Sequence, residues 1–421
     1  MPAKAAEPAS GAASGPAAAL ADAHLLSRFQ ALDHFLLQHQ ALWRPRPFTE
    51  RQLPWETEHP ALAQWLRQRT LSDAEAAHNH PETLDAPAPY PQLAAQAAQL
   101  AAVGELPAIA IAPAPPRLNV DVPGRKWQQI EAFASHLGFT HTPRHWLDWC
   151  AGKGHLGRRL LHNDQHLTCL EYDPALVQAG QTLSQHHGLN AEHRLQDVLA
   201  DNTDQQLSPQ HTPVALHACG DLHVRLIQLA SARGCNQLAI APCCYNRTQG
   251  PLYQPLSSAA QASALQLSLD DLGLPLSETV TAGARVRRQR DLSMARRLGF
   301  DLLQRQQRGI DAYLPTPSLP SSWLDKPFAD YCRDLAALKN LPLHGNPDWD
   351  ALEAAGQTRL AEVRNLELLR NLFRRPLELW LVLDRALYLQ AQGYRVQLGQ
   401  FCDYALTPRN LMLLAERNQR Q

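Results

Sequence analysis

The stretch from Trp146 to Gly157 constrains the fold more than any other part of the chain. It begins as a short apolar strand, passes an acid at Asp148, and ends in a turn that contains Gly152 and Gly154. A strand that runs into a glycine-rich turn brings its backbone close to a ligand, and the following helix offers free N–H groups there. This pattern indicates a nucleotide-like cofactor at the carboxyl edge of a parallel sheet.

Two kinds of cofactor fit this turn. The glycine spacing matches the dinucleotide fingerprint of nicotinamide enzymes, which alone is a weak match. The frame Asp-x-Cys-Ala-Gly-x-Gly is similar to the first motif of S-adenosylmethionine-dependent methyltransferases, with Cys150 at the first glycine, and we favour this reading. Cysteine fits there if position 150 does not need a positive φ. A turn that binds nothing is the third alternative. The turn residues predicted to hold the methyl donor are Asp148, Cys150, Gly152, Lys153 and Gly154.

A second acid supports the same site. The segment from Leu167 to Glu171 reads as the next strand, and it ends in an acid 23 residues after Asp148. A carboxylate at this place can accept hydrogen bonds from both ribose hydroxyls of an adenosine cofactor. Taken alone, Glu171 is equally compatible with a solvated strand end. Together with the turn, it is predicted to bind the donor.

Two later strand ends are expected at the same edge of the sheet. Asp197 follows the third strand, where an acid can meet the adenine amino group, although a solvated turn explains it equally well. His217 ends the fourth strand, and the carboxyl ends of parallel strands share one crevice. Both residues are predicted to contact the donor. Asp221 either accepts a proton or caps the next helix, and we favour the cap.

The end of the fifth strand is predicted to frame the methyl acceptor. Methyl transfer is an in-line displacement that needs positioning and electrostatics more than a protein nucleophile. An aromatic ring can stack on a planar substrate, and an amide can fix its edge. The alternative is a buried loop in which the cysteines act as small hydrophobic residues. The predicted catalytic residues are Cys243, Cys244, Tyr245 and Asn246.

Charge and cysteine usage bound the partners. The net charge is −1, so any basic surface must be local. Eight arginines crowd the stretch Arg285–Arg308, which predicts a contact with RNA or, alternatively, a solvated helix face. The eight cysteines include no C-x-x-C pair, so we expect no metal site. With no signal-peptide pattern and no run of 18 apolar residues, we expect a cytoplasmic protein without a membrane partner.

Four ordered motifs carry a family resemblance over about residues 120–421. They are Asp148-x-Cys-Ala-Gly-Lys-Gly-His155-Leu, His217-Ala-Cys-Gly-Asp-Leu222, Cys243-Cys244-Tyr245 and Pro408-Arg409-Asn410. Together they resemble the methyltransferase-like family twenty-five, whose relatives include tRNA acceptor-stem 2′-O-methyltransferases. The resemblance implies an S-adenosylmethionine cofactor, a donor loop at 148–155 with Glu171, and a substrate site near 243–246. Relatives often carry His where this chain has Asn246, and Glu where it has Gln129.

The order of elements predicts an α/β fold. Strands and helices alternate from residue 145 to 241, which is typical of a doubly wound, Rossmann-like methyltransferase sheet. The alternation stops after Tyr245 and resumes near residue 376. The expected divisions are a disordered tail (1–20), an N-terminal helical region with a linker (21–117), the first part of the donor-binding domain (118–249), a helical insertion (250–376), and a closing helix and hairpin (377–421). From these features the sequence predicts a methyltransferase acting on RNA, with a protein or small-molecule methyltransferase, or a donor-binding scaffold without catalysis, as alternatives.

Overall fold

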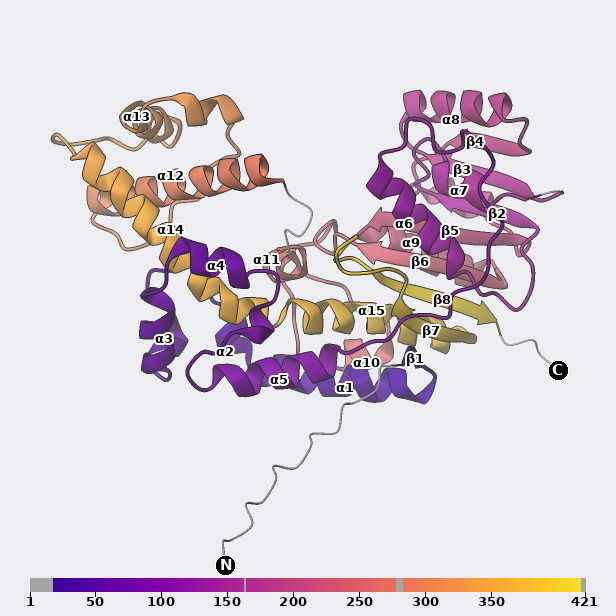
Figure 1. Cartoon of the computed structure of the whole chain (residues 1–421), viewed down its shortest axis with the longest axis horizontal. Coiled ribbons are helices and arrows are strands. Elements are labelled where there is room, and N and C mark those ends of the chain that lie inside the picture. The colour runs from indigo at the N-terminus through magenta and orange to yellow at the C-terminus, as the bar shows by residue number, and fades with distance from the viewer. Residues whose placement is uncertain (1–17, 163, 278–282, 418–421) are drawn as a thin grey trace, which may run out of the picture.

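The computed structural model describes residues 18–162, 164–277 and 283–417 (Figure 1). A single eight-stranded sheet has the order β1-β7-β8-β6-β5-β2-β3-β4. The predicted doubly wound α/β sheet is confirmed. The strands are β1 Leu20–Ala21, β2 His145–Trp149, β3 His166–Glu171, β4 Ala191–Leu195, β5 His211–Cys219, β6 Gln237–Cys243, β7 Tyr394–Gln400 and β8 Leu411–Arg417.

The five neighbouring strands β4, β3, β2, β5 and β6 run parallel to one another. Strand β8 is antiparallel to β6, and β7, which pairs antiparallel with β8, runs in the same direction as β6. Because β8 is antiparallel to β6, it begins beside the carboxyl end of β6, and Ile240 pairs with Leu413. The loop before β8 therefore lies at the same edge as the ends of β2, β3 and β5. Strand β1 adds a short antiparallel pairing to β7 that the sequence did not suggest.

Helices cover both faces of the sheet and continue beyond it (Figure 1). The first group is α1 Ala23–Gln38, α2 Gln40–Trp43, α3 Pro60–Arg67, α4 Leu71–Ala77, α5 Tyr90–Ala101, α6 Gly124–Ser135, α7 His155–Leu160, α8 Pro174–His186 and α9 Asp221–Ala232. The second group is α10 Ser258–Gln261, α11 Leu269–Gly273, α12 Ala284–Arg308, α13 Phe328–Leu338, α14 Trp349–Asn371 and α15 Arg374–Ala391. Short 3₁₀ helices are η1 Pro54–Glu56, η2 Pro81–Thr83, η3 Asp201–Gln206, η4 Leu274–Leu276 and η5 Ser321–Asp325. In the described part of the chain, no helix has both the length and the apolar character needed to span a bilayer.

Two expectations about local structure need correction. A helix was expected between the third and fourth strands, but only the 3₁₀ helix η3 forms there, because its sequence DNTDQQ is made mainly of poor helix formers. The predicted disordered tail lies outside the described residues up to residue 17. Its last residue, Leu20, is buried and belongs to β1.

One hydrophobic core joins the N-terminal helices to the sheet. Phe29 on α1 packs against Trp380 on α15, with ring centroids 5.1 Å apart. The same buried cluster includes Trp43 of α2 and Ile240 of β6. Helix α15 lies between the N-terminal helices and the sheet (Figure 1). The N-terminal region therefore shares its apolar interior with the sheet.

Helices α12, α13 and α14, which lie between β6 and β7 in the sequence, form a helical lobe (Figure 1). Helix α12 packs closely along α14, where glycines permit the approach: a Cβ at Gly356 would lie 2.5 Å from the carbonyl oxygen of Ala295. Phe300, Leu303 and Tyr331 build a separate small core there. The N-terminal end of α12 points toward the side of the sheet on which β6 ends (Figure 1). The lobe thus faces the edge where the predicted site lies.

Candidate functional site

The turn after β2 has the backbone of a ligand-binding loop. Its φ angles are positive at Cys150 (56°), Gly152 (58°) and Gly154 (74°). The expectation that position 150 would not need a positive φ is therefore wrong. Cys150 adopts a left-handed backbone conformation, which costs about 1–2 kcal/mol for a residue other than glycine. The turn is held by hydrogen bonds from the Ala151 N–H to Leu170 (3.0 Å) and from the Gly154 N–H to Ala151 (2.8 Å).

The two turn glycines have different surroundings. A Cβ built on Gly152 would meet nothing within 4 Å, whereas one on Gly154 would lie 2.6 Å from His193 Cε1 and 2.9 Å from Cys169 Sγ. Gly152 thus opens onto empty space, and Gly154 lets the turn pack against the strands. An open backbone of this kind fits a cofactor that must approach the chain closely. Lys153 lies half-buried between them, and its carbonyl accepts a hydrogen bond from Arg158 (2.5 Å).

Asp148 supports the turn from beneath. It is buried, and its Oδ2 accepts a hydrogen bond from the Gly157 N–H at 2.9 Å, at the start of α7. Burial raises the pKa of Asp148 to about 7, against the lowering effect of that hydrogen bond. The carboxyl group therefore positions strand and helix relative to each other, and it does not line the cavity described next.

Glu171 points toward the turn. Its Oε2 accepts a hydrogen bond from the Gly152 N–H at 2.8 Å, and its Oε1 accepts from the N–H groups of Tyr172 (2.9 Å) and Asp173 (3.0 Å). The carboxylate is thus fixed at the carboxyl end of β3, beside the open glycine. This is the placement that a ribose diol requires.

A cavity of about 350 Å³ opens beside these groups. It brings together three of the predicted residues: Cys150, Glu171 and Asp197. The sequence reasoning missed Tyr172, which is 72% exposed, and Leu222 at the start of α9. The signal for Tyr172 was its place directly after the strand-ending acid. The remaining lining residues are Leu170, Gln196 and Val198. The volume, the apolar walls and the fixed carboxylate suit the adenosine part of S-adenosylmethionine.

His217 lies at an irregularity of β5, where the pairing with β6 shifts register between Leu216 and Cys219. Its φ is 67°, and its Nε2 lies 2.7 Å from Gln129 Oε1 on α6. Burial lowers the pKa of His217, which favours the neutral ring. The histidine does not line the donor cavity. It faces Gln129 of α6.

The residues after β6 separate into different environments. Cys243 is buried and Cys244 half-buried, whereas Asn246 is exposed. Tyr245 lies inside the core, where its hydroxyl is 3.3 Å from Glu378 Oε1. Its ring is therefore unavailable to stack on a substrate. Of the four predicted catalytic residues, Cys244 and Asn246 are accessible from solvent.

Three strand ends carry left-handed backbone at residues other than glycine: Cys150 after β2, His217 in β5, and Cys244 after β6 (φ 48°). Such conformations persist only where the surroundings impose them, and they concentrate at functional sites. All three lie at the carboxyl edge of the sheet. The strained positions therefore mark the same edge as the motifs.

Two further expectations meet different outcomes. Asp221 does not cap α9, because Gly220 occupies the cap position; its Oδ2 accepts a hydrogen bond from the Gln249 N–H (2.8 Å) and so holds the loop after β6.

Most arginines of the stretch from 285 to 308 bind within the lobe. Those with protein partners include Arg290, Arg296, Arg297, Arg305 and Arg308. The exposed arginines lie in the first turns of α12.

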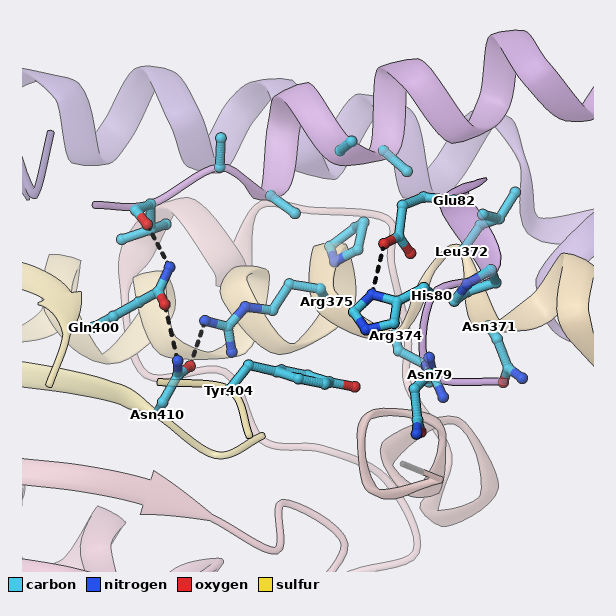
Figure 2. Close-up of a pocket in the computed structure, with 17 residues that line it drawn as sticks. Asn79, His80, Glu82, Asn371, Leu372, Arg374, Arg375, Gln400, Tyr404 and Asn410 are labelled. Carbon is cyan, nitrogen blue, oxygen red and sulfur yellow. Dashed lines mark hydrogen bonds and ion pairs between the residues drawn. The ribbon is translucent and has the colours of Figure 1, made fainter. Parts of the chain in front are cut away.

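A second cavity, of about 410 Å³, lies between the N-terminal region and the start of α15 (Figure 2). Its walls include His80, Tyr404 and Arg375, and the two rings lie 6.0 Å apart. Arg375 donates a hydrogen bond to Asn410 Oδ1 (2.7 Å), in the loop before β8. The cavity therefore adjoins the end of β7 and the start of β8, because Gln400 and Asn410 also line it.

Comparisons with known proteins agree with this geometry. Residues 125–251 match the family model of a methyltransferase domain, which spans α6 to the loop after β6. A search of curated proteins finds no significant match.

Several solved structures are similar to the chain at low TM-scores. A geranyl diphosphate methyltransferase in complex with GPP and sinefungin is 12% identical, with 35% of this chain and 59% of that chain covered and a TM-score of 0.23. A 23S rRNA methyltransferase is 12% identical, with 49% and 97% covered and a TM-score of 0.23. A coclaurine N-methyltransferase bound to N-methylheliamine and SAH is 10% identical, with 82% and 90% covered and a TM-score of 0.24.

The structure places an open glycine turn, a strand-ending carboxylate and an adenosine-sized cavity within the segment that the family model matches. The chain therefore carries an S-adenosylmethionine-dependent methyltransferase domain.

Proposed function

We propose that the chain methylates RNA, with tRNA as the first candidate, and that it is a relative of the methyltransferase-like family twenty-five. The donor is held by Glu171 and the turn at Gly152, with Asp197 and Cys150 lining the adenosine cavity. The acceptor approaches the edge formed by His217, Cys244 and Asn246. The protein's contribution is to orient donor and acceptor in line and to exclude water.

The observation that carries the RNA proposal is a group of cations around this edge. Lys126 of α6 and Arg409 before β8 both lower the pKa of His217, after the larger effect of burial. Arg409 and Arg247 both act electrostatically on Cys244. Three segments far apart in the sequence thus bring positive charge to one place. A phosphate backbone is the acceptor chemistry that such a cluster attracts.

The lobe adds a second basic element on the facing side. Arg285 and Arg288 are exposed in the first turns of α12, which points toward this edge (Figure 1). The five arginines from Arg290 onward have partners within the protein, so the proposed RNA contact is confined to the start of α12. An extended acceptor could touch both the sheet edge and the lobe. We place this activity in the cytoplasm, where the free thiols of the chain remain reduced.

The test is transfer of a tritiated methyl group to fractionated RNA. The wild type should label an RNA fraction, and the label should be lost on RNase treatment. The double variant Lys126→Ala with Arg409→Ala should reduce kcat/KM for RNA by about tenfold or more, and leave donor affinity unchanged. Lys339→Ala, at the end of α13, is the matched control. Label that survives RNase but not protease would refute the RNA proposal.

A small-molecule acceptor is the second candidate, and the cavity of Figure 2 favours it. Two buried polar atoms there, Asn79 Oδ1 and Asn371 Nδ2, have no hydrogen-bond partner among the described residues. A buried acceptor and donor without partners suit a ligand with a polar edge. Under this reading His80→Ala would raise the KM for the acceptor, whereas RNA labelling would be absent. A chain that binds the donor but labels nothing would favour a scaffold.

A further inference from the structure

The carboxyl edge of β5 and β6 gathers three thiols that are distant in the sequence. Cys219 ends β5 and pairs with Cys243 at the end of β6. The Sγ atoms of these two residues are 3.6 Å apart, and Cys244 Sγ lies within 4.8 Å of both. We expected no metal site, because the sequence contains no C-x-x-C pair and Cys219 lies 24 positions before Cys243. The parallel pairing of the strands removes that separation.

We propose that Cys219, Cys243 and Cys244 form a zinc site. Zinc binds thiolate sulfur at about 2.3 Å in tetrahedral geometry, which sets the sulfur atoms about 3.8 Å apart. The 3.6 Å between Cys219 and Cys243 is close to this value without a zinc ion. Three protein ligands leave the fourth position for a water molecule or an acceptor atom, which is the arrangement of catalytic zinc sites.

The backbone at Cys244 gives an independent reason for this reading. In an extended strand, successive side chains point to opposite faces, so adjacent cysteines ordinarily present their thiols in opposite directions. The φ of 48° at Cys244 breaks this alternation and lets both thiols turn to Cys219. A left-handed conformation at cysteine is costly and needs compensation. Shared coordination of one ion supplies it, whereas a disulfide between Cys219 and Cys243 would leave Cys244 unused.

The charges around the trio also agree with thiolate ligands. Arg409 and Arg247 lie close enough to Cys244 to act on it electrostatically. Three thiolates with one divalent zinc ion carry a net charge of −1, which two guanidinium groups can balance. Because zinc binds thiolates, its binding should release protons from the trio.

Cobalt substitution tests the site directly. The full-length chain, reduced and freed of metal with a chelator, is titrated with Co²⁺ and then with Zn²⁺. One equivalent of cobalt should produce thiolate charge-transfer and tetrahedral d–d absorption, which one equivalent of zinc should abolish. Cys219→Ser should weaken binding by more than the roughly 10- to 100-fold typical of a lost outer-shell partner. Cys332→Ser, in the lobe core, is the matched control and should bind as the wild type does.

A variant that fails to fold does not leave the question open. In the unmodified chain, zinc should protect the peptides containing Cys219, Cys243 and Cys244 from alkylation, as measured by mass spectrometry. A reduced, folded chain that gives no thiolate absorption with cobalt would overturn the proposal. So would equal alkylation with and without zinc, or recovery of a Cys219–Cys243 disulfide in a chain that ignores cobalt after reduction. These readouts need no methyl transfer, so they remain informative if the proposed activity fails.

Discussion

Alanine in place of the two turn glycines should separate donor binding from folding. Both residues have positive φ, at 58° for Gly152 and 74° for Gly154. Alanine in this region costs about 1–2 kcal/mol at either position. At Gly154 the added methyl would also lie 2.6 Å from His193 Cε1, which adds about 1–3 kcal/mol of overpacking. Gly154→Ala should therefore lose about 2–5 kcal/mol of unfolding free energy, and Gly152→Ala only about 1–2 kcal/mol.

Donor affinity should follow the opposite order among the folded proteins. The methyl of Gly152→Ala enters open space, where it meets no atom of the described residues within 4 Å. A bound donor would occupy that space, so the clash should cost about 1–3 kcal/mol, or roughly 5- to 150-fold in Kd. Gly188→Ala is the control, because Gly188 has a φ of 63°, equally empty surroundings and a place at the end of α8.

Urea unfolding gives the stabilities, and calorimetric titration with S-adenosylmethionine gives the Kd values. Gly152→Ala and Gly188→Ala should unfold at similar urea concentrations and differ only in donor affinity. Equal donor affinity in these two variants would refute the placement of the donor at the turn. Wild-type stability in Gly154→Ala would refute the packing described for that residue.

Three further predictions concern charge. Glu171→Gln should weaken donor binding by about 10- to 100-fold, because hydrogen bonds to a charged carboxylate are worth about 1.5–3 kcal/mol, and calorimetry with Glu192→Gln as control checks this. Asp148→Asn should gain stability relative to the wild type as the pH rises from about 4 to 7, by at most about 1.4 kcal/mol per pH unit. The reason is that burial raises the pKa of Asp148 from 3.8 to about 7 in the folded chain. Between these two values the unfolded wild type has released the proton that the folded wild type keeps, so the wild type loses unfolding free energy as the pH rises, whereas the Asn variant does not. A pH-independent difference in urea unfolding would contradict that assignment. Arg285→Ala with Arg288→Ala should lower RNA affinity, and reduce the slope of log affinity against log salt concentration by about 1 per lost contact, without destabilising the chain. In contrast, Arg296→Ala should lower the unfolding temperature, because the Arg296 guanidinium donates a hydrogen bond to the Lys326 carbonyl at 2.9 Å. Unchanged RNA binding in the double variant would remove α12 from the proposed interface.

The sheet could be predicted from sequence because its signals are local. Each strand is a short apolar run, and Asp148, Gly152 and Glu171 stand at fixed offsets from strand ends. The donor turn follows from the same pattern. The positive φ at Cys150 did not, since a cysteine gives no local sign that it adopts glycine's backbone.

Long-range contacts decided what the sequence could not show. Cys219 meets Cys243 only because β5 and β6 pair in one register, and Tyr245 turns into the core because α15 supplies Glu378 as a partner. The interior packing of the arginines in α12 also depends on carbonyls and acids from other segments. Amino-acid composition does not distinguish such buried, paired arginines from exposed ones. Their hydrogen-bond partners in the structure indicate that several of them stabilise the lobe.

The shared core has a consequence for how this chain can be divided. Phe29 and Trp43 belong to the same apolar interior as Trp380 and Ile240, and α15 has the N-terminal helices on one side. A polypeptide beginning at residue 118 would leave that side of α15 bare to water. Such a fragment would tend to self-associate, even though it contains every residue of the donor turn. The amino-terminal helices therefore stabilise the sheet that carries the donor turn, although they lie outside the motif-bearing segment.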